Sequence, residues 1–250
     1  MMTTIPKNHP RYKSLKTREK ISDAMKKGIV HETGLIAHGR GEAFDYLIGE
    51  KSVYFADEAA KIAAAMLITA KNPVLSINGN VAALVLDEII ELSNEIPAKI
   101  EINLFHRTNE RIKRINEMFT NKTEKKIYGL KADGLIPGLE HDRGLCDKEG
   151  ILSSDVVLVP LEDGDRCHAL KNLNKKIITI DLNPLSRTSK CADVTIVDNV
   201  IRAIPNINKW VKLLKREDEK SIKEISNRWD NAKNLSEVLN FLSKRLNSLF

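Results

Sequence analysis

Five short apolar runs divide the middle of the chain, at residues 73–78, 99–105, 155–160, 176–181 and 193–198. A short, continuous apolar run is typical of a strand that is buried on both faces. Most of the segments between the runs have the length and composition of helices. Strands that alternate with helices predict an α/β fold, in which a mostly parallel sheet is flanked by helices.

Helical segments precede the first strand. Residues 11–28 predict a basic amphipathic helix, because apolar side chains recur near one face at helical spacing. Three glycines, Gly34, Gly39 and Gly41, then predict a loop. We expect only a short helix after this loop, over residues 42–48, where the next glycine would end it.

A second helical extension is expected at the other end of the chain. Apolar side chains recur there at steps of three and four, at Ile222, Ile225, Trp229, Ala232, Leu235, Leu239, Leu242, Leu246 and Phe250. The sequence thus predicts one α/β domain over residues 1–215, including the N-terminal helical segment. Residues 216–250 would form a C-terminal amphipathic helix that packs on the core or on a dimer partner.

The composition is that of an ordinary globular protein, with 42% hydrophobic and 30% charged residues. No apolar run approaches the roughly 20 residues that span a bilayer, and the first residues lack the apolar stretch of a secretory signal. The three cysteines, Cys146, Cys167 and Cys191, are widely spaced, which argues against a disulfide framework. We therefore expect a cytoplasmic protein with no membrane partner.

The net charge of +6 indicates a mildly basic surface or a field that attracts anions. Aromatic residues make up only 5% of the chain, so stacking surfaces for single-stranded nucleic acid are scarce. The lysines are also spread widely and form no single stripe. These features favour anionic small molecules over nucleic acid as partners.

Polar residues follow each predicted strand, and ligands of open parallel sheets gather at the carboxyl ends of the strands. The first strand is followed by Asn78, Gly79 and Asn80, where backbone amides at a helix start could hold an anion or could simply form a capped turn. His106 and Arg107 follow the second strand and suggest another anion site. Single strand ends of this kind are weak signals, but several of them point to the same edge of the sheet.

Three carboxylates follow the third predicted strand, at Glu162, Asp163 and Asp165. Carboxylates suit magnesium, hydroxyl groups or an ammonium group. The spacing of the cysteines and histidines contains no short pair typical of a zinc site, so we expect no structural zinc.

The segment AHGRGEAFDY, at residues 37–46, places Arg40 between Gly39 and Gly41. Glycines permit close approach of a ligand to the backbone, and a guanidinium suits phosphate. The glycines do not form a dinucleotide-binding fingerprint, because position 44 is Phe and no strong strand precedes them. The chain also lacks the phosphate-binding loop G-x-x-x-x-G-K-[ST].

Several blocks of sequence, in order, resemble archaeal phosphopantothenate synthetase, the 4-phosphopantoate–β-alanine ligase family. The blocks are IPKNHPRYKSLKTREKI, GLIAHGRGEAFDYLIGE, NPVLSINGNVAAL, KIEINLFHRTNERI, ADGLIPGLEHDRG, DVVLVPLEDGDR and ITIDLNPLSRTSKCADVTIVDNVIRAIPN. Together they cover about residues 5–215, and the C-terminal tail carries no comparable signal. The resemblance implies a Rossmann-like catalytic domain and a homodimer.

The resemblance also implies a reaction in coenzyme A biosynthesis. ATP, with Mg2+, would activate the carboxylate of 4-phosphopantoate as an acyl-adenylate and release pyrophosphate. The amine of β-alanine would then displace AMP and give 4′-phosphopantothenate. Two other interpretations remain open: a non-catalytic nucleotide-binding regulator on a Rossmann-like fold, and a nucleic-acid-binding protein.

Roles for individual residues follow partly from the resemblance and partly from charge and position. The resemblance implies ATP contacts at Arg18, Arg40, Asp181, Leu182, Asn183, Arg187, Thr188, Asn199 and Val200. Charge and position favour Asn78, Gly79, Asn80, His106 and Arg107 for phosphopantoate. The same reasoning favours Glu162, Asp163 and Asp165 for β-alanine or magnesium. We expect Arg40 to neutralise phosphate charge, and His106 or Asp165 to accept the proton of the amine.

Overall fold

The structure, a computed structural model, describes residues 5–161 and 163–249. Within these residues a central sheet contains β1 (Pro73–Ile77), β2 (Lys99–Ile102), β3 (Ile127–Tyr128), β6 (Val156–Pro160), β7 (Lys176–Ile180) and β8 (Val194–Ile196). The strand order is β3-β2-β1-β6-β7-β8, and every neighbouring pair is parallel. The five predicted strands and the α/β fold are confirmed. The order reverses between β1 and β6, as in the doubly wound, Rossmann-like arrangement.

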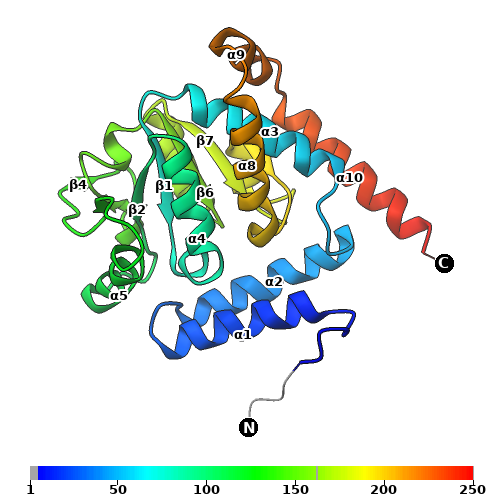
Figure 1. Cartoon of the computed structure of the whole chain (residues 1–250), viewed down its shortest axis with the longest axis horizontal. Helices are drawn as coiled ribbons and strands as arrows, with labels where there is room; N and C mark the ends of the chain where they lie inside the picture. Colours follow the sequence, from blue (N-terminus) through cyan, green and yellow to red (C-terminus); the bar gives the residue numbers. More distant parts are fainter. Residues whose placement is uncertain (1–4, 162, 250) are drawn as a thin grey trace.

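Helices cover both faces of the sheet (Figure 1). In chain order they are α1 (Tyr12–Lys26), α2 (Glu32–Ile48), α3 (Tyr54–Thr69), α4 (Gly79–Glu95), α5 (Asn109–Thr120), α6 (Gly164–Asn172), α7 (Arg187–Cys191), α8 (Val200–Leu214), α9 (Glu219–Asn227) and α10 (Asn231–Asn247). Over the described part of the chain, none of them is both long and apolar enough to cross a bilayer.

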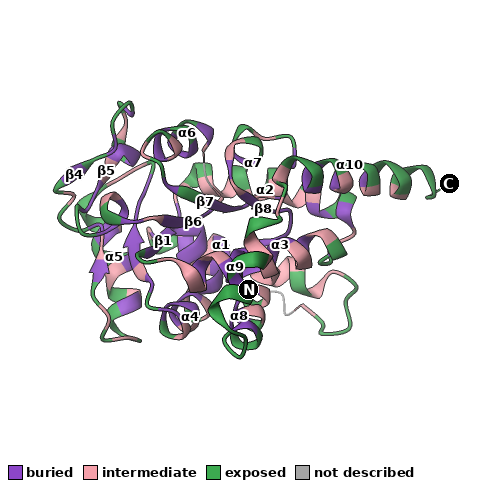
Figure 2. Ribbon diagram, turned by 90° about the horizontal axis from the view of Figure 1, so that it is seen from above, coloured by how far each residue is buried: buried purple, intermediate pink, exposed green. Residues whose placement is uncertain are grey.

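Alternate residues of the strands enter two different apolar layers, as the period of a strand requires. Leu75, Ile77 and Leu158 belong to the larger layer, which also contains buried side chains of α3, α4 and α8. Val74 and Val157 point to the opposite layer, with Leu170 of α6 and other buried apolar side chains. The strands are therefore buried on both faces, which explains why the sequence shows continuous apolar runs (Figure 2).

Residues 131–153 between β3 and β6 contain a two-stranded antiparallel ribbon, β4 (Gly134–Leu135) and β5 (Leu145–Cys146). Two short 3-10 helices follow the same path, η1 (Asp142–Gly144) and η2 (Ile151–Ser153). The segment stands beside β2 and α5 (Figure 1).

The predicted loop at Gly34, Gly39 and Gly41 is wrong, because all three lie inside the helix α2. None of these three glycines has a positive φ. The helix instead begins after His31, whose side chain accepts a hydrogen bond from the Thr33 amide, and ends at Gly49, whose φ is 100°. The caps at the two ends, together with packing on α1 and α4, outweigh the roughly 1 kcal/mol that a helical glycine costs relative to alanine.

The C-terminal helical stretch is divided into α9 and α10, and Asp230 caps the second helix through a hydrogen bond from the Lys233 amide. The buried apolar residues of α10 are Leu235, Val238 and Leu242. Beyond them the helix projects away from the body of the molecule (Figures 1 and 2), and Leu246 is 41% exposed. Phe250 lies outside the described residues.

Candidate functional site at the carboxyl edge of the sheet

Helix α2 lies across the carboxyl edge of the sheet, with α1 alongside it (Figure 1). Three cavities open beneath and beside α2. The central cavity is bounded by His31, His38, Asn78, His106, Arg111, Arg143 and Asn199, among others. The α7 cavity contains Arg40, Asp163, Asp181, Asn183, Arg187 and Thr188, and the α1 cavity contains Arg11, Glu42, Asp45 and Arg202.

The three cavities share walls. Ala37, Gly41, Leu161 and Leu182 line both the central and the α7 cavities. His38 and Asn199 line both the central and the α1 cavities. Neighbouring cavities are thus directly adjacent beneath α2. This arrangement suits a reaction between two or more bound molecules.

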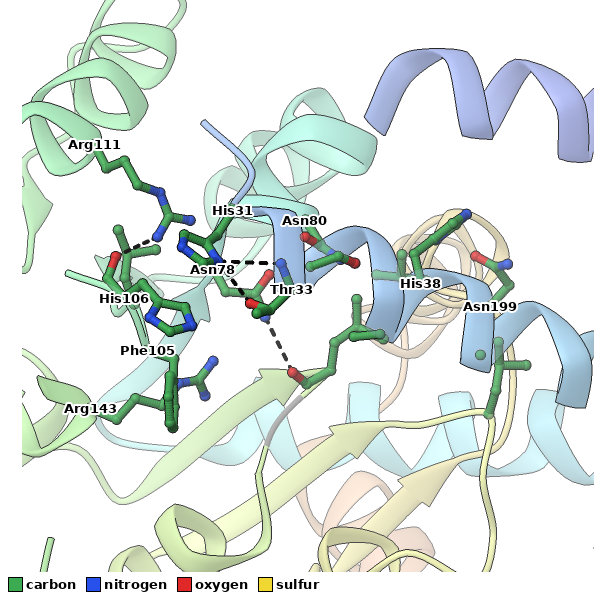
Figure 3. Close-up of a pocket in the computed structure, with 18 residues that line it drawn as sticks. His31, Thr33, His38, Asn78, Asn80, Phe105, His106, Arg111, Arg143 and Asn199 are labelled. Atoms are coloured by element: carbon green, nitrogen blue, oxygen red, sulfur yellow. Dashed lines mark hydrogen bonds between the residues drawn. The ribbon is translucent and has the colours of Figure 1, made fainter. Parts of the chain in front are cut away.

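Asn78 lies at the point where the strand order reverses. Its side-chain oxygen accepts a hydrogen bond from the Val81 amide at 3.0 Å, and its Nδ2 donates to the Pro160 carbonyl at 3.1 Å. The residue therefore caps α4 and ties β1 to β6. The sequence prediction of a helix start at Asn78, Gly79 and Asn80 is confirmed, and all three residues line the central cavity. Asn78 and Asn80 are labelled in Figure 3.

The start of α4 is packed closely against the N-terminal helices. A Cβ atom at Gly79 would lie 2.4 Å from the carbonyl oxygen of Ile29, so no larger residue fits there without a backbone shift. Asn80 donates a hydrogen bond to the Gly34 carbonyl at 3.0 Å. The first contact holds the start of α4 against the turn between α1 and α2, and the second holds it against α2.

Two histidine rings stack at one end of the central cavity. The rings of His31 and His106 lie 3.8 Å apart between centroids, with an interplanar angle of 22° (Figure 3). Burial lowers the pKa of His106, and the neighbouring His31 and Arg111 lower it further. His106 is thereby favoured as a neutral imidazole in the absence of a bound anion.

Two arginines that the sequence did not single out lie at the same end of the cavity (Figure 3). Arg111 of α5 donates to the carbonyl of Ile29 at 2.9 Å and to the carbonyl of His106. Arg143 is only 6% exposed, and its Nε lies 3.7 Å from Asp163 Oδ2. Burial, followed by the nearby charge of Arg166, lowers the pKa of Arg143 to about 9.

The α7 cavity combines residues from the ends of β6 and β7 with Arg40 of α2. Burial raises the pKa of Asp181, although Ser186 donates to it at 2.5 Å and Arg40 stabilises its charge. Asp163 caps α6 by accepting from the Arg166 amide at 2.9 Å. Arg187 pairs with Asp165 at 2.7 Å. This cavity therefore presents two arginines together with hydrogen-bonding groups that suit a polar, anionic ligand.

A network of charged residues connects α2 to α8 on the far side of the central cavity. Arg202 contacts Asp45 at 2.5 Å and Asp198 at 2.6 Å. Asn199 donates to Asp45 at 3.0 Å, and Ser52 donates to Asp198 at 2.5 Å. Burial raises the pKa of Asp198, and Arg202 opposes that rise. The network fixes α2 over the strand ends.

The structure brings most of the sequence-predicted site residues to the cavities, but not all of them. Within the described parts of the chain, Arg18, Arg107 and Asp165 do not line any of the three cavities. Arg18 pairs with Glu42 at 2.8 Å, and Arg107 donates to the Gly129 carbonyl at 2.6 Å. Glu162 lies outside the described residues.

Metal ligands are also sparse in the part of the chain that the structure describes. No group of three or more His, Cys, Asp or Glu side chains there is arranged to hold a metal ion. Asp163 faces the α7 cavity, whereas Asp165 is engaged by Arg187. A magnesium ion that arrives with a nucleotide needs only one or two protein carboxylates, because phosphate oxygens and water supply the rest.

The doubly wound sheet and the cavities at its switch point define an α/β protein whose site suits anionic small molecules. A sequence profile described as phosphopantothenate/pantothenate synthetase matches residues 55–245. The chain belongs to this family, and it is therefore an enzyme.

Curated relatives extend the match over nearly the whole chain. A 4-phosphopantoate–β-alanine ligase of Thermococcus onnurineus (strain NA1) is 51% identical over 99% of this chain and 95% of its own length. Proteins with the same name from Methanosarcina mazei and Methanospirillum hungatei are 47% and 53% identical, over 99% and 86% of this chain. They are covered over 98% and 87% of their own lengths, respectively.

Proposed function

We propose that this protein uses ATP to join 4-phosphopantoate to β-alanine through an acyl-adenylate. The products would be 4′-phosphopantothenate, AMP and pyrophosphate, on the route to coenzyme A. The observation that carries the proposal is the shared wall between two cavities suited to anions, formed by Ala37, Gly41, Leu161 and Leu182 beneath α2. The names of the relatives supply the two substrates to be joined.

ATP would occupy the α7 cavity and extend along α2 toward Asn199 and Val200. Arg40 and Arg187 lie where phosphate charge would be neutralised, and the ends of β7 and α7 offer Asp181, Asn183 and Thr188 for the nucleoside. Arg18 would need to leave Glu42 to reach the same ligand. Asp163 would be a ligand of the magnesium ion that accompanies the phosphates. This ion would reduce the negative charge that the carboxylate of 4-phosphopantoate has to approach.

In the first half-reaction, a carboxylate oxygen of 4-phosphopantoate would attack the α-phosphorus of ATP, and pyrophosphate would leave. In the second, the amine of β-alanine would attack the acyl carbon, and AMP would leave with the bridging oxygen. Positioning and charge neutralisation are the main requirements of both steps. His106, which lines the central cavity, is better placed to accept the amine proton than Asp165, which is paired with Arg187.

A product assay tests the proposal. Purified protein is mixed with ATP, magnesium, 4-phosphopantoate and β-alanine, and the products are separated by chromatography with mass detection. We expect AMP and 4′-phosphopantothenate in equal amounts. Without β-alanine, no 4′-phosphopantothenate can form, and we expect at most one AMP per enzyme site. Folded protein that yields no phosphopantothenate would refute the proposed ligation. ADP and inorganic phosphate in place of AMP would refute the adenylate route alone.

We also propose that the enzyme is a cytoplasmic homodimer that does not bind nucleic acid, with a catalytic domain over residues 1–215. Exposed aromatic and aliphatic side chains on α2, α3 and the projecting α10 support an interface: Tyr46 is 49% exposed, Tyr54 70% and Leu246 41%. Light scattering after size exclusion would distinguish a dimer from a monomer. Titration with duplex and single-stranded polynucleotides at low salt would reveal any nucleic-acid affinity.

A further inference from the structure

The α1 cavity is left without a ligand by the proposed reaction, in which ATP occupies the α7 cavity and the acid lies beneath α2. Its walls come from the segment before α1, from α1 itself, from α2 and from the start of α8. His38 and Asn199 line both this cavity and the central cavity. A third substrate in the α1 cavity would therefore lie next to the other two.

The charged side chains that line the α1 cavity are of both signs. The basic ones include Lys7, Arg11 and Lys13, and the acidic ones include Glu42, Asp45 and Glu50. Of the described residues that line the central cavity, in contrast, none is acidic. A lining of mixed charge suits a small zwitterion, because such a molecule carries one ammonium group and one carboxylate group.

Arg11, in the wall of the α1 cavity, is held in place by several contacts. Its Nη2 donates to Ser14 Oγ at 3.0 Å and to Glu50 Oε1 at 3.3 Å. Its Cζ lies 4.3 Å from the centroid of the Tyr46 ring. Its Nε is buried and has no hydrogen-bond partner in the described part of the chain. A guanidinium that is fixed by a ring and keeps one donor unused is suited to bind a carboxylate.

His38 lies in the wall that separates the α1 cavity from the central cavity, and its Nε2 is buried with no hydrogen-bond partner among the described residues. Burial lowers the pKa of His38, and the charge of Glu42 opposes the fall. The ring is thus neutral at neutral pH and can accept a proton, and Glu42 stabilises the resulting imidazolium. His106, in comparison, stacks on His31 at the opposite end of the central cavity (Figure 3).

We propose that the α1 cavity is the subsite for the amino-acid substrate, with Arg11 at its carboxylate and His38 at its amine. This assignment rests on the proposed ligase function, which identifies the amino acid as β-alanine. The neutral amine attacks the acyl carbon, and its nitrogen forms the amide bond. One amine proton passes to Nε2 of His38, while the bond from the acyl carbon to the bridging oxygen breaks and AMP leaves with the electron pair. β-Alanine therefore binds away from Asp163, which faces the α7 cavity.

The role of Arg11 is tested with Arg11→Gln and with β-alaninamide, in which a neutral amide replaces the carboxylate. We expect Arg11→Gln to lower kcat/KM for β-alanine by roughly 10-fold or more and to leave that for β-alaninamide unchanged, since a charged hydrogen bond contributes at this level. Arg11→Lys, which keeps the charge, replaces this variant if it does not fold, and it should lose part of the same preference. An equal loss for both amines would overturn the assignment.

Lys16→Gln is the matched control for Arg11→Gln. Lys16 is a cation of α1 that pairs with a carboxylate, Glu19, at 2.6 Å, and it lines none of the three cavities as they are described. The control should leave the ratio of the two amines at the value of the wild type. A control that loses the preference as Arg11→Gln does would count against the subsite.

Separate measurement of the two half-reactions tests the role of His38. Formation of the acyl-adenylate is followed by the exchange of labelled pyrophosphate into ATP, with 4-phosphopantoate present and no amine. We expect His38→Gln to keep this exchange within about 3-fold of the wild type and to lower kcat/KM for β-alanine by ~100-fold, as for the loss of a general base. Loss of the exchange would overturn the role of His38. A selective loss of the amine step in His106→Gln, but not in His38→Gln, would also overturn it.

A binding measurement distinguishes failure of the subsite from failure of the proposed function. Saturation transfer from the protein to β-alanine is recorded by NMR with 4-phosphopantoate and α,β-methylene-ATP, a nucleotide that cannot transfer AMP. We expect strong transfer with the wild type and Lys16→Gln, and much weaker transfer with Arg11→Gln. That pattern in a protein that forms no phosphopantothenate would support the subsite and refute the function. Equal transfer with all three proteins, or transfer with none, would refute the subsite, whatever the activity.

Discussion

Arg202 of α8 contacts Asp45 of α2 at 2.5 Å, and this ion pair joins the helix that covers the site to α8. The same guanidinium contacts Asp198 at the end of β8, at 2.6 Å. Asp45 and Asp198 are 6% and 1% exposed. The cation therefore compensates two carboxylates that have little access to water.

Removing this cation should destabilise the protein more than removing an exposed partner of similar geometry. We expect Arg202→Ala to lower the free energy of unfolding by about 3 kcal/mol, because it leaves buried carboxylates uncompensated. Urea unfolding monitored by circular dichroism measures the change. The control is Lys223→Ala, whose exposed partner Glu219 lies one helical turn away, and it should not shift the midpoint. Equal midpoints for the two variants would contradict the role of Arg202.

Gly79 and Gly39 should respond in opposite directions to substitution by alanine. A Cβ at Gly79 meets the Ile29 carbonyl at 2.4 Å, whereas a Cβ at Gly39 meets no atom within 4 Å. We expect Gly79→Ala to destabilise by about 1–3 kcal/mol and to reduce activity, since the backbone must shift. Gly39→Ala should stabilise the helix by about 0.5–1 kcal/mol and preserve activity. A destabilised Gly39→Ala would mean that the glycine has another role.

Substitution of Arg40 tests the proposal that ATP binds in the α7 cavity. It lines the α7 cavity and its charge acts on Asp181. We expect Arg40→Ala to reduce kcat/KM for ATP by at least ~100-fold, a typical loss for a preorganised charged contact. Lys20→Ala serves as the control, because Lys20 is an exposed cation on the neighbouring helix α1 and lines none of the three cavities as they are described. Steady-state kinetics with nearly equal rates for Arg40→Ala and wild type would refute the role.

Glu101 predicts a pH dependence of stability. This fully buried carboxyl of β2 accepts hydrogen bonds from the amides of Asp147 and Ile151. Burial raises its pKa from 4.5 to about 7, although the two amides oppose the rise. The folded state binds this proton more tightly than the unfolded state. The stabilising contribution of protonated Glu101 to the free energy of unfolding is therefore fully present below pH 4.5 and is lost as pH rises through 7.

The variant Glu101→Gln isolates this contribution, since an amide does not titrate. The variant is therefore expected to become more stable relative to the wild type as pH rises from about 4.5 to about 7.5, by up to about 3 kcal/mol. Unfolding free energies of the two proteins, measured by urea titration at several pH values, test this. A difference between the two that stays constant with pH would mean that Glu101 titrates at its ordinary value.

The strands were predictable because burial on both faces leaves a continuous apolar run, as in residues 155–160. The location of the ligand-binding edge of the sheet was predictable from the same runs, because the carboxyl ends of parallel strands lie at one edge. The order β3-β2-β1-β6-β7-β8 was not predictable from these patterns. The crossover lengths allow several orders, and packing selects one of them.

The continuity of α2 could not be predicted from local propensity, because Gly34, Gly39 and Gly41 weaken the signal of the helix in isolation. Packing favours glycine at position 34, because a Cβ there would lie 2.5 Å from Asn80 Oδ1 and the Asn80 side chain would have to move. The helix starts after His31, whose side chain accepts from the Thr33 amide. Histidine is not among the residues that favour the start of a helix, so the sequence carries no strong start signal there.

The arginines show a second limit of sequence reasoning. Arg107 lies shortly after the strand predicted over residues 99–105 and was expected at the site, yet its side chain donates to the Gly129 carbonyl. Arg111 is one helical turn further along, and Arg143 lies in a segment without periodicity, but both face the central cavity. The direction in which a side chain points near the start of a helix is set by tertiary contacts, and so is the path of an irregular segment. Neither could be derived from the spacing of residues in the sequence.

The transfer of labelled oxygen tests the proposed reaction most directly. The enzyme is supplied with ATP, β-alanine and 4-phosphopantoate that carries ¹⁸O in both carboxylate oxygens, and the products are analysed by mass spectrometry. An acyl-adenylate requires one labelled oxygen in AMP and one in the amide of 4′-phosphopantothenate. Unlabelled AMP, or label in inorganic phosphate together with ADP, would contradict the account.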